Sequence, residues 1–154
     1  MNIKNPKESQ VEMTEIVLPQ HTNSLGTIFG GVILSWTDIA AAIAAQKHCQ
    51  KMVVTASFDA MNFLAPIHLG WIVYIKGQVN YASETSCEVG IKINAENPLT
   101  QESHHTASAY ITMVAIDSNG RPTKIPKINP DSPDEKRRYE EAKIRRENRL
   151  KLRK

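Results

Sequence analysis

The sequence has few of the residues that build disulfide frameworks, and its first residues do not resemble a secretory signal. Its two cysteines, Cys49 and Cys87, lie 38 residues apart, a spacing that is not typical of a metal site. So few cysteines in 154 residues indicate free thiols in a reducing compartment rather than a disulfide scaffold. The first ten residues, MNIKNPKESQ, are polar and lack the apolar core of a secretory signal. We therefore expect a cytoplasmic protein.

Catalytic and metal-binding motifs based on histidine are also missing. The five histidines comprise the adjacent pair His104–His105 and three isolated residues, and none forms a His-x-x-x-His pair. No Gly-x-Ser-x-Gly elbow occurs, and Cys87 has no obvious base partner. The sequence thus predicts no metal and no cofactor, and it does not support a catalytic triad.

Charge is distributed unevenly along the chain. Residues 131–154 carry ten Lys or Arg and six Asp or Glu, whereas the rest of the chain carries nine and ten. The positive net charge of the chain, +3, therefore comes from the C-terminal segment, and the rest of the chain is not basic. Because acids are interspersed among its bases, the segment is typical of a solvated or subunit-contacting helix, and we expect no nucleic-acid partner.

The pattern of polar and apolar residues predicts one long helix among several strands. The stretch 28–49 predicts the helix. Alternating residues predict strands at 11–18, 71–82, 86–97 and 105–117, and a stretch rich in strand-forming residues predicts one at 52–65. One strand, one helix and four strands joined mostly by short connections predict an antiparallel sheet wrapped around a single central helix, an α+β fold.

Three regions follow from these elements. Residues 1–10 are predicted to be a flexible tail, and residues 11–128 a single domain. Residues 129–154 are predicted to be a basic helical extension, with its cap near Asp131 or Ser132 and Pro133 in its first turn.

The predicted central helix carries one carboxylate, Asp38, within the apolar run LSWTDIAAAIAA. No side of this helix is clearly hydrated, which is typical of a buried helix. The next basic residue, Lys47, lies nine positions away at a different helical azimuth, and an unpaired buried carboxylate is costly. Asp38 therefore lies at a surface notch, bonds to Ser35 one turn back, or has a catalytic role. A membrane-spanning helix is disfavoured because Asp38 in mid-bilayer costs about 2.5–3.5 kcal/mol.

Two adjacent glycines, Gly30 and Gly31, lie in the first turn of the predicted helix. Each costs about 1 kcal/mol of helix stability relative to alanine, so we expect them to have a role. One role is close packing of the helix against the sheet or a second subunit. The other is chemical, because bare N–H groups at a helix N-terminus can bind a carbonyl oxygen. Together with Asn23 in the preceding loop and Asp38, they provide the groups needed to hydrolyse an acyl compound.

The stretches HTNSLGTIFGGVILSWTDIAAAIAA and VVTASFDAMNFLAPIHLGWIV resemble the hot-dog-fold acyl-CoA thioesterases, in the acyl-coenzyme A hydrolase branch with Asn-x-x-Gly-x-x-Phe-Gly-Gly and a helical Asp. The resemblance covers roughly residues 11–128. It implies a sheet curled around the central helix, dimers with a continuous sheet, and hexamers built as trimers of these dimers. It also implies hydrolysis of acyl-CoA to a free fatty acid and coenzyme A, in sites at the dimer interface.

Specific roles follow from the matching motif positions. The resemblance implies a catalytic pair, Asn23 and Asp38, contributed by opposite subunits. Thr55, in VVTAS, matches a polar position that helps to hold the water. Gly30 and Gly31 would polarise the thioester carbonyl through backbone N–H groups. Asp38 would act as general base or as nucleophile, and the sequence does not separate these.

Coenzyme A carries phosphates, which bind to cations or N–H groups. The candidate cations are Arg121 and Lys124, in the segment GRPTKIPK that also contains Lys127. Thr85 and Ser86 lie at a turn that resembles the coenzyme-contacting Thr-Ser of the family.

Two other functions remain open from the sequence. A non-catalytic acyl-CoA sensor fits the same fold, although it has no need of Asn23 together with Asp38. A hot-dog acyl-thioester dehydratase would use a histidine with a carboxylate, and the pattern has Asn23 where that histidine would serve.

Overall fold

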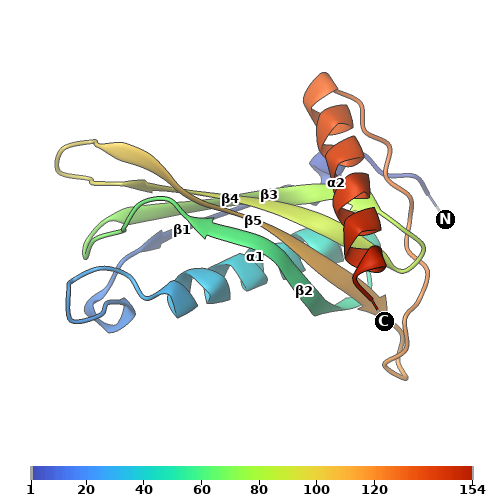
Figure 1. Ribbon diagram of the computed structural model, residues 1–154, viewed down its shortest axis with the longest axis horizontal. Coiled ribbons are helices and arrows are strands. Elements are labelled where there is room, and N and C mark those ends of the chain that lie inside the picture. Colours follow the sequence, from blue (N-terminus) through green and yellow to red (C-terminus); the bar gives the residue numbers. More distant parts are fainter. Residues whose placement is uncertain (1, 154) are drawn as a thin grey trace.

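The structure is a computed structural model that describes residues 2–153 of the chain. A five-stranded antiparallel sheet, in the order β1-β3-β4-β5-β2, curls around one long helix, α1 (Gly30–Cys49) (Figure 1). The strands are β1 (Val11–Ile16), β2 (Met52–Phe63), β3 (Ile72–Ala82), β4 (Ser86–Glu96) and β5 (Ser103–Ile116). Two short 3-10 helices, η1 (Pro6–Ser9) and η2 (Pro19–His21), flank β1, and a second α-helix, α2 (Pro133–Lys151), ends the chain. The predicted α+β arrangement is confirmed.

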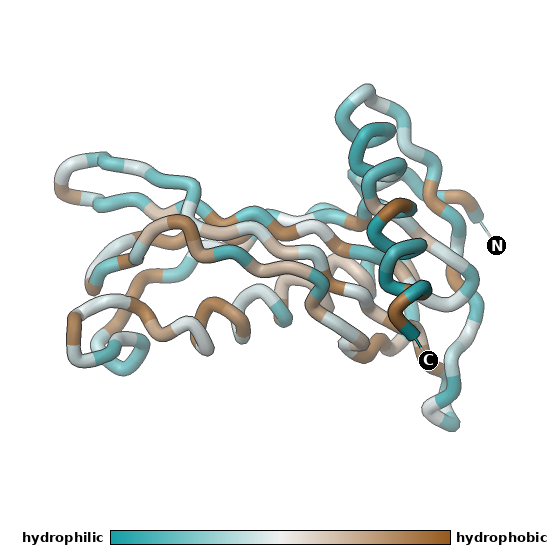
Figure 2. Tube along the Cα trace, in the orientation of Figure 1, coloured by the Kyte–Doolittle hydropathy of each residue, from teal (hydrophilic) through white to brown (hydrophobic). Residues whose placement is uncertain are grey.

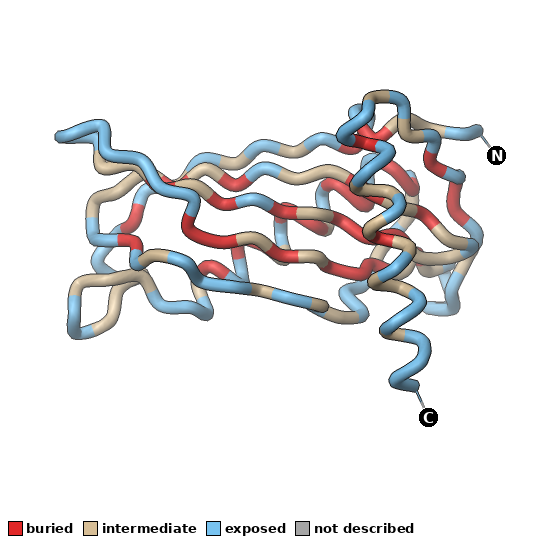
Figure 3. The backbone as a smooth tube through the Cα atoms, turned by 45° about the horizontal axis from the view of Figure 1, so that its top comes forward, coloured by how far each residue is buried: buried red, intermediate tan, exposed pale blue. Residues whose placement is uncertain are grey.

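The core lies between α1 and the concave face of the sheet. Ala40, Ala41 and Ala44 of α1 are fully buried, and their small side chains let the helix approach the strands closely. Alternate residues of β3 and β4, such as Ile75 and Ile93, fill the space beneath them. Polar and apolar residues alternate along the strands in Figure 2, and Figure 3 shows the buried positions gathered on the middle of the sheet.

Within one chain α1 is not buried on every side, so that part of the sequence-based expectation was wrong. Its residues Leu34, Ile39 and Ile43 are 38%, 48% and 36% exposed. Beside them lies the edge strand β2, where Val54 and Phe58 are 45% and 38% exposed. We call these five residues the apolar edge. Exposed apolar side chains on neighbouring elements are typical of a surface that contacts another molecule.

The N-terminal segment lies against the domain and is not a free tail. The Lys4 amide donates to the carbonyl of Lys127 at 2.9 Å, and the Asn129 amide donates to the carbonyl of Lys4 at 2.7 Å. Ser9 is fully buried, and its hydroxyl accepts the Val79 amide at 2.8 Å. Residues 4–10 therefore belong to the folded unit.

The predicted C-terminal helix is confirmed as α2, and it packs on the convex face of the sheet. Ser132 caps it by accepting the Glu135 amide at 3.1 Å, while Oε1 of Glu135 accepts the Ser132 amide at 3.2 Å. Ala142 of α2 is buried. The rings of Tyr139 and Tyr81 of β3 lie edge to face, with 5.0 Å between their centres. None of the helices in residues 2–153 is long and apolar enough to cross a membrane.

Candidate active site

The first group of predicted site residues lies in the loop before α1. Oδ1 of Asn23 accepts the amides of Leu25 and Thr27 at 2.9 and 3.2 Å, and its Nδ2 donates to Oγ1 of Thr27 at 3.0 Å. These bonds hold the side-chain amide in one orientation, as in an Asx turn. Because an amide nitrogen has two hydrogens, one N–H of Asn23 remains for a further acceptor.

The N-terminus of α1 follows directly after this loop. No acceptor within residues 2–153 bonds to the amides of Gly30 and Gly31, as expected of the first residues of a helix. A Cβ added at Gly31 would meet nothing within 4 Å, and one at Gly30 would make only ordinary contact with Phe63, at 3.6 Å. Packing against the sheet therefore does not explain the two glycines. A ligand or a second subunit remains as the explanation.

The second group lies further along α1 and on β2. Asp38 is half-buried, and Oγ1 of Thr55 donates a hydrogen bond of 2.6 Å to its Oδ1. The hydrogen-bond partner of Asp38 is therefore Thr55, and not Ser35, which lies one helical turn before Asp38. No salt bridge among the described residues involves Asp38, so its negative charge is not neutralised within the chain.

These two groups do not meet within one chain. Asp38 follows Gly30 by eight residues, which places it about 12 Å further along the helix axis. Reacting atoms must approach to about 3–3.5 Å, and an aspartate side chain is too short to cover the difference. We therefore distinguish a loop half-site (Asn23, Gly30, Gly31) from a helix half-site (Asp38, Thr55). The helix half-site lies on the apolar edge, next to Ile39 and Val54.

A cavity of about 350 Å³ opens beside the loop half-site. Thr27 and Gly30 line it, and most of its other lining residues are apolar, among them Ile33, Phe63 and Ile67. The cavity therefore joins the free amides of α1 to an apolar volume. Thr27 and Phe63 were not identified as site residues from the sequence, since neither carries a chemical group that marks it.

The residues predicted to bind coenzyme A come from two segments that the fold brings together. The Ala115 amide donates to the carbonyl of Thr85, and the Ile125 amide donates to the carbonyl of Glu84, both at 3.0 Å. Ser86 pairs with Val114 of β5, which in turn pairs with Val54 of β2. This turn therefore lies at the same level of the sheet as the helix half-site, two strands away.

A wide cavity of about 830 Å³ lies beside this turn. Lys124, Lys127 and Arg146 line it, together with Tyr139. Arg121 is not among its lining residues, and its amide bonds instead to Oδ1 of Asp117 at 3.0 Å. Arg146 and Tyr139 belong to α2, and no sequence pattern predicted that this helix folds back over the turn.

Neither cysteine is paired, and no metal cluster is present in the described part of the chain. Cys49 and Cys87 are free and buried. Within residues 2–153 no three or more His, Cys, Asp or Glu lie close enough together to hold a metal ion.

Known proteins match the chain over most of its length. Residues 25–101 match the thioesterase superfamily. An uncharacterized acyl-CoA thioester hydrolase of Bacillus subtilis is 39% identical over 129 residues, which cover 84% of this chain and 75% of that protein. The chain belongs to the thioesterase superfamily.

Two solved structures are similar to this thioesterase over nearly its whole length. A hexameric acyl-CoA thioesterase solved without ligand is 40% identical with a TM-score of 0.94, covering 99% of this chain and 100% of that one. The acyl-CoA hydrolase of Staphylococcus aureus, solved with butyryl coenzyme A, coenzyme A and coenzyme A disulfide, is 37% identical with a TM-score of 0.89, over 96% and 90% of the two chains. The predicted hot-dog fold is confirmed.

Three variants of the Staphylococcus hydrolase have also been solved, each with one residue replaced by alanine. The replaced residues are an Asn, an Asp and a Thr. Asn precedes Asp by 15 positions and Asp precedes Thr by 17, which are the separations of Asn23, Asp38 and Thr55 in this thioesterase.

Proposed function

We propose that this thioesterase hydrolyses acyl-CoA to a free fatty acid and coenzyme A, in sites shared by two chains. The observation that carries the proposal is the separation of the two half-sites within one chain, with the helix half-site on an exposed apolar edge. A second copy whose apolar edge packs against the first brings the helix half-site of one chain to the loop half-site of the other. The names and bound ligands of the related hydrolases support acyl-CoA as the substrate class.

The two half-sites divide the chemistry between them. The amides of Gly30 and Gly31 bind the thioester oxygen and stabilise the negative charge that develops on it. The remaining N–H of Asn23 orients the substrate or the water. Water adds to the carbonyl carbon as Asp38 of the other chain takes its proton, and the carbon–sulfur bond then breaks to release the thiolate of coenzyme A.

Thr55 keeps the Asp38 carboxylate oriented, since its hydroxyl occupies Oδ1 and leaves Oδ2 for the water. A nucleophilic route, in which Asp38 attacks the carbonyl and the resulting anhydride is hydrolysed, uses the same groups. A thiolate leaves readily, so neither route needs a strong acid or a metal. We propose that the enzyme uses no cofactor.

The substrate occupies the two cavities. The acyl chain lies in the apolar cavity beside Gly30, and the phosphates of coenzyme A bind near Lys124 in the wide cavity, with Thr85 and Ser86 close by. Arg121, Thr85 and Ser86 are weaker candidates than Lys124, because none of these three residues lines the cavity.

The assembly that fits these features is a hexamer made of three dimers, as the related hexameric thioesterase suggests. The dimer buries the apolar edge. We also propose a cytoplasmic location, supported by the unpaired thiols of Cys49 and Cys87. We propose no nucleic-acid partner, because arginines of α2 such as Arg145 are paired with carboxylates.

The test is release of free thiol from acyl-CoA substrates ranging from acetyl to palmitoyl. We expect turnover with at least one chain length and a loss of about 100-fold or more in kcat for Asp38→Asn, which keeps the shape of the side chain but cannot accept a proton. Asp134→Asn is the matched control, because Asp134 lies on an exposed turn of α2 and pairs only with Arg137. Binding of acyl-CoA without release of thiol would contradict the proposal and indicate a sensor. Near-normal rates in Asp38→Asn would show that this residue is not catalytic.

A further inference from the structure

The strand that carries Thr55 is irregular at that position. β2 is an edge strand, and within the chain it pairs only with β5. Its register shifts between Thr55 and Ser57 and again between Phe58 and Ala60, so that two residues, at positions 56 and 59, have no partner on β5. Bulges of this kind re-aim neighbouring side chains and weaken the ladder that holds a strand in register. The ladder alone therefore does not fix the orientation of Thr55.

The unpaired residue of the second shift is Asp59, and α2 holds it from outside the sheet. Nη1 of Arg149 donates to Oδ2 of Asp59 at 2.7 Å, and the two side chains are 22% and 15% exposed. The hydroxyl of Ser57 donates to Oδ1 of the same carboxylate at 3.1 Å. A chain of contacts thus runs from α2 through Asp59 and Ser57 to the residues next to Thr55.

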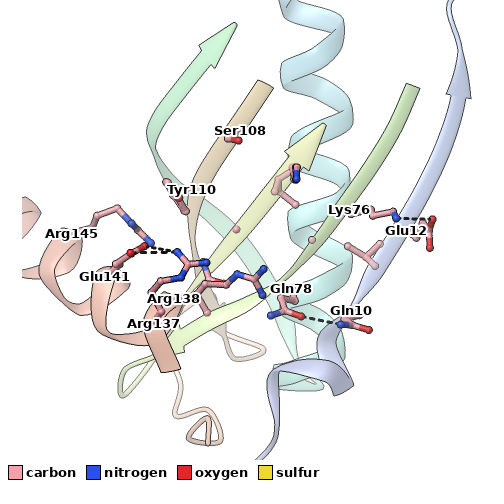
Figure 4. A pocket seen from close by; sticks show the side chains of 16 residues that line it. Gln10, Glu12, Lys76, Gln78, Ser108, Tyr110, Arg137, Arg138, Glu141 and Arg145 are labelled. Carbon is pink, nitrogen blue, oxygen red and sulfur yellow. Dashed lines mark hydrogen bonds and ion pairs between the residues drawn. The ribbon is translucent and has the colours of Figure 1, made fainter. Parts of the chain in front are cut away.

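The helix that supplies Arg149 is itself fixed to the sheet one turn earlier. Nε and Nη2 of Arg145 donate to Oε2 and Oε1 of Glu88 at 3.0 and 2.7 Å, in a forked pair. Glu88 is 4% exposed, and the Arg145 guanidinium lies 3.6 Å from the ring centre of Tyr110 (Figure 4). Tyr110 is the β5 partner of Ala60, which follows Asp59. Arg145 and Arg149 are four residues apart and share one helix face.

We propose that α2 positions the active-site strand: Arg149 holds Asp59 and Ser57, and these keep the bulged part of β2 in the shape that directs Thr55 to Asp38. Arg149 is a positioning residue, since it touches neither the proposed substrate sites nor Asp38. The inference rests on the proposed role of the Thr55–Asp38 pair. It gives the basic C-terminal helix a function in catalysis.

The first test is the kinetics of Arg149→Gln in acyl-CoA hydrolysis. We expect kcat to fall about tenfold, because a small displacement of a positioning group is costly in rate, while KM stays within about twofold of the wild-type value. Arg149→Lys should recover part of the loss, because it keeps the charge. Arg137→Gln is the matched control, because this substitution removes the same charge from the same helix. Among residues 2–153, Arg137 forms salt bridges only with Asp134 and Glu141, both on α2. Size-exclusion chromatography with light scattering checks that the assembly is unchanged.

The second test separates positioning from a general loss of stability. If Arg149 acts through Thr55, then Arg149→Gln should lower kcat less than twofold when Thr55 is already valine. Equal losses in the two backgrounds would overturn the inference while leaving the proposed hydrolase intact.

A third measurement does not depend on turnover. Hydrogen exchange of the amides at 55–60 should be faster in Arg149→Gln than in Arg137→Gln, because an unsupported bulge opens more often. Unchanged exchange there would overturn the inference whether or not the protein hydrolyses acyl-CoA. An inactive wild-type protein with faster exchange in Arg149→Gln would instead contradict the proposed function alone.

Discussion

The hydroxyl of Thr55 donates a hydrogen bond of 2.6 Å to Oδ1 of Asp38, across the gap between the edge strand and the central helix. This bond joins residues that are 17 positions apart, and no cation pairs with the carboxylate in the described part of the chain. A lysine or arginine beside Asp38 would favour its charged form and weaken it as a base. A neutral hydroxyl instead orients the carboxylate without placing a positive charge beside it.

Thr55→Val should therefore lower kcat by about tenfold or more, because valine has the shape of threonine but cannot donate the bond. KM should change little, since Thr55 lines neither cavity. Thr55→Ser should retain most of the activity. The measurement is steady-state thiol release, and equal rates for the valine and serine variants would show that the hydroxyl is not needed.

Phe63→Ala should change the chain-length preference of the enzyme. Phe63 lines the proposed acyl cavity and lies next to Gly30, so its removal enlarges the apolar volume at the carbonyl. Each additional methylene that the cavity buries should raise kcat/KM by about fourfold, the equivalent of about 0.8 kcal/mol. The ratio of kcat/KM for octanoyl-CoA to that for butyryl-CoA measures this effect. Leu99→Ala, at an exposed position between β4 and β5 and outside the lining of this cavity, is the control, and an equal change in both variants would place the acyl chain elsewhere.

His48 should make the stability of the protein depend on pH. It is fully buried near the end of α1, and its Nε2 lies 2.7 Å from the carbonyl of Pro126, while its Nδ1 has no hydrogen-bond partner among residues 2–153. Burial lowers the pKa of His48 below its ordinary value of 6.5. The unfolded chain therefore binds a proton that the folded protein does not. Stability should be full above pH 6.5 and should fall as the pH drops from there through the lower pKa of the folded state.

Denaturant unfolding between pH 5 and pH 8, at one protein concentration, measures this dependence. His48→Gln should flatten the curve, because glutamine keeps a donor for Pro126 but does not titrate. His68→Gln, at an exposed histidine, should leave the slope in place. A curve for His48→Gln that is as steep as that of the wild type would assign the pH dependence to other groups.

Much of the fold could be predicted from local patterns in the sequence. Alternation and strand propensity predicted all five strands, and the Ala40–Ala45 run predicted α1, because these signals depend only on neighbouring residues. The motif that contains Asn23 and Asp38 predicted the residues of both proposed half-sites. What local patterns could not show was whether the apolar side of α1 faces its own sheet or a second chain, since both bury the same residues.

Contacts between distant charged residues also could not be predicted. Arg149 and Asp59 are 90 positions apart, and both read as solvated charges in the sequence. Arg145 of α2 likewise pairs with Glu88 of β4, which lies 57 positions earlier in the chain. Such pairs depend on where α2 crosses the sheet, and periodicity does not determine that position. For the same reason the sequence did not show that the N-terminal segment pairs with the chain near Asn129.

The most direct test of the shared site is complementation between two inactive variants, Asn23→Ala and Asp38→Ala. When the two chains are co-expressed at equal levels, about half of the dimers are mixed, and each mixed dimer has one site with both side chains intact and one with neither. We therefore expect about a quarter of the wild-type kcat per chain, against a loss of about 100-fold in each parent assembly. Assemblies that contain both chains, confirmed by tagging each variant differently, yet hydrolyse acyl-CoA no faster than the parents would contradict a site built from two chains.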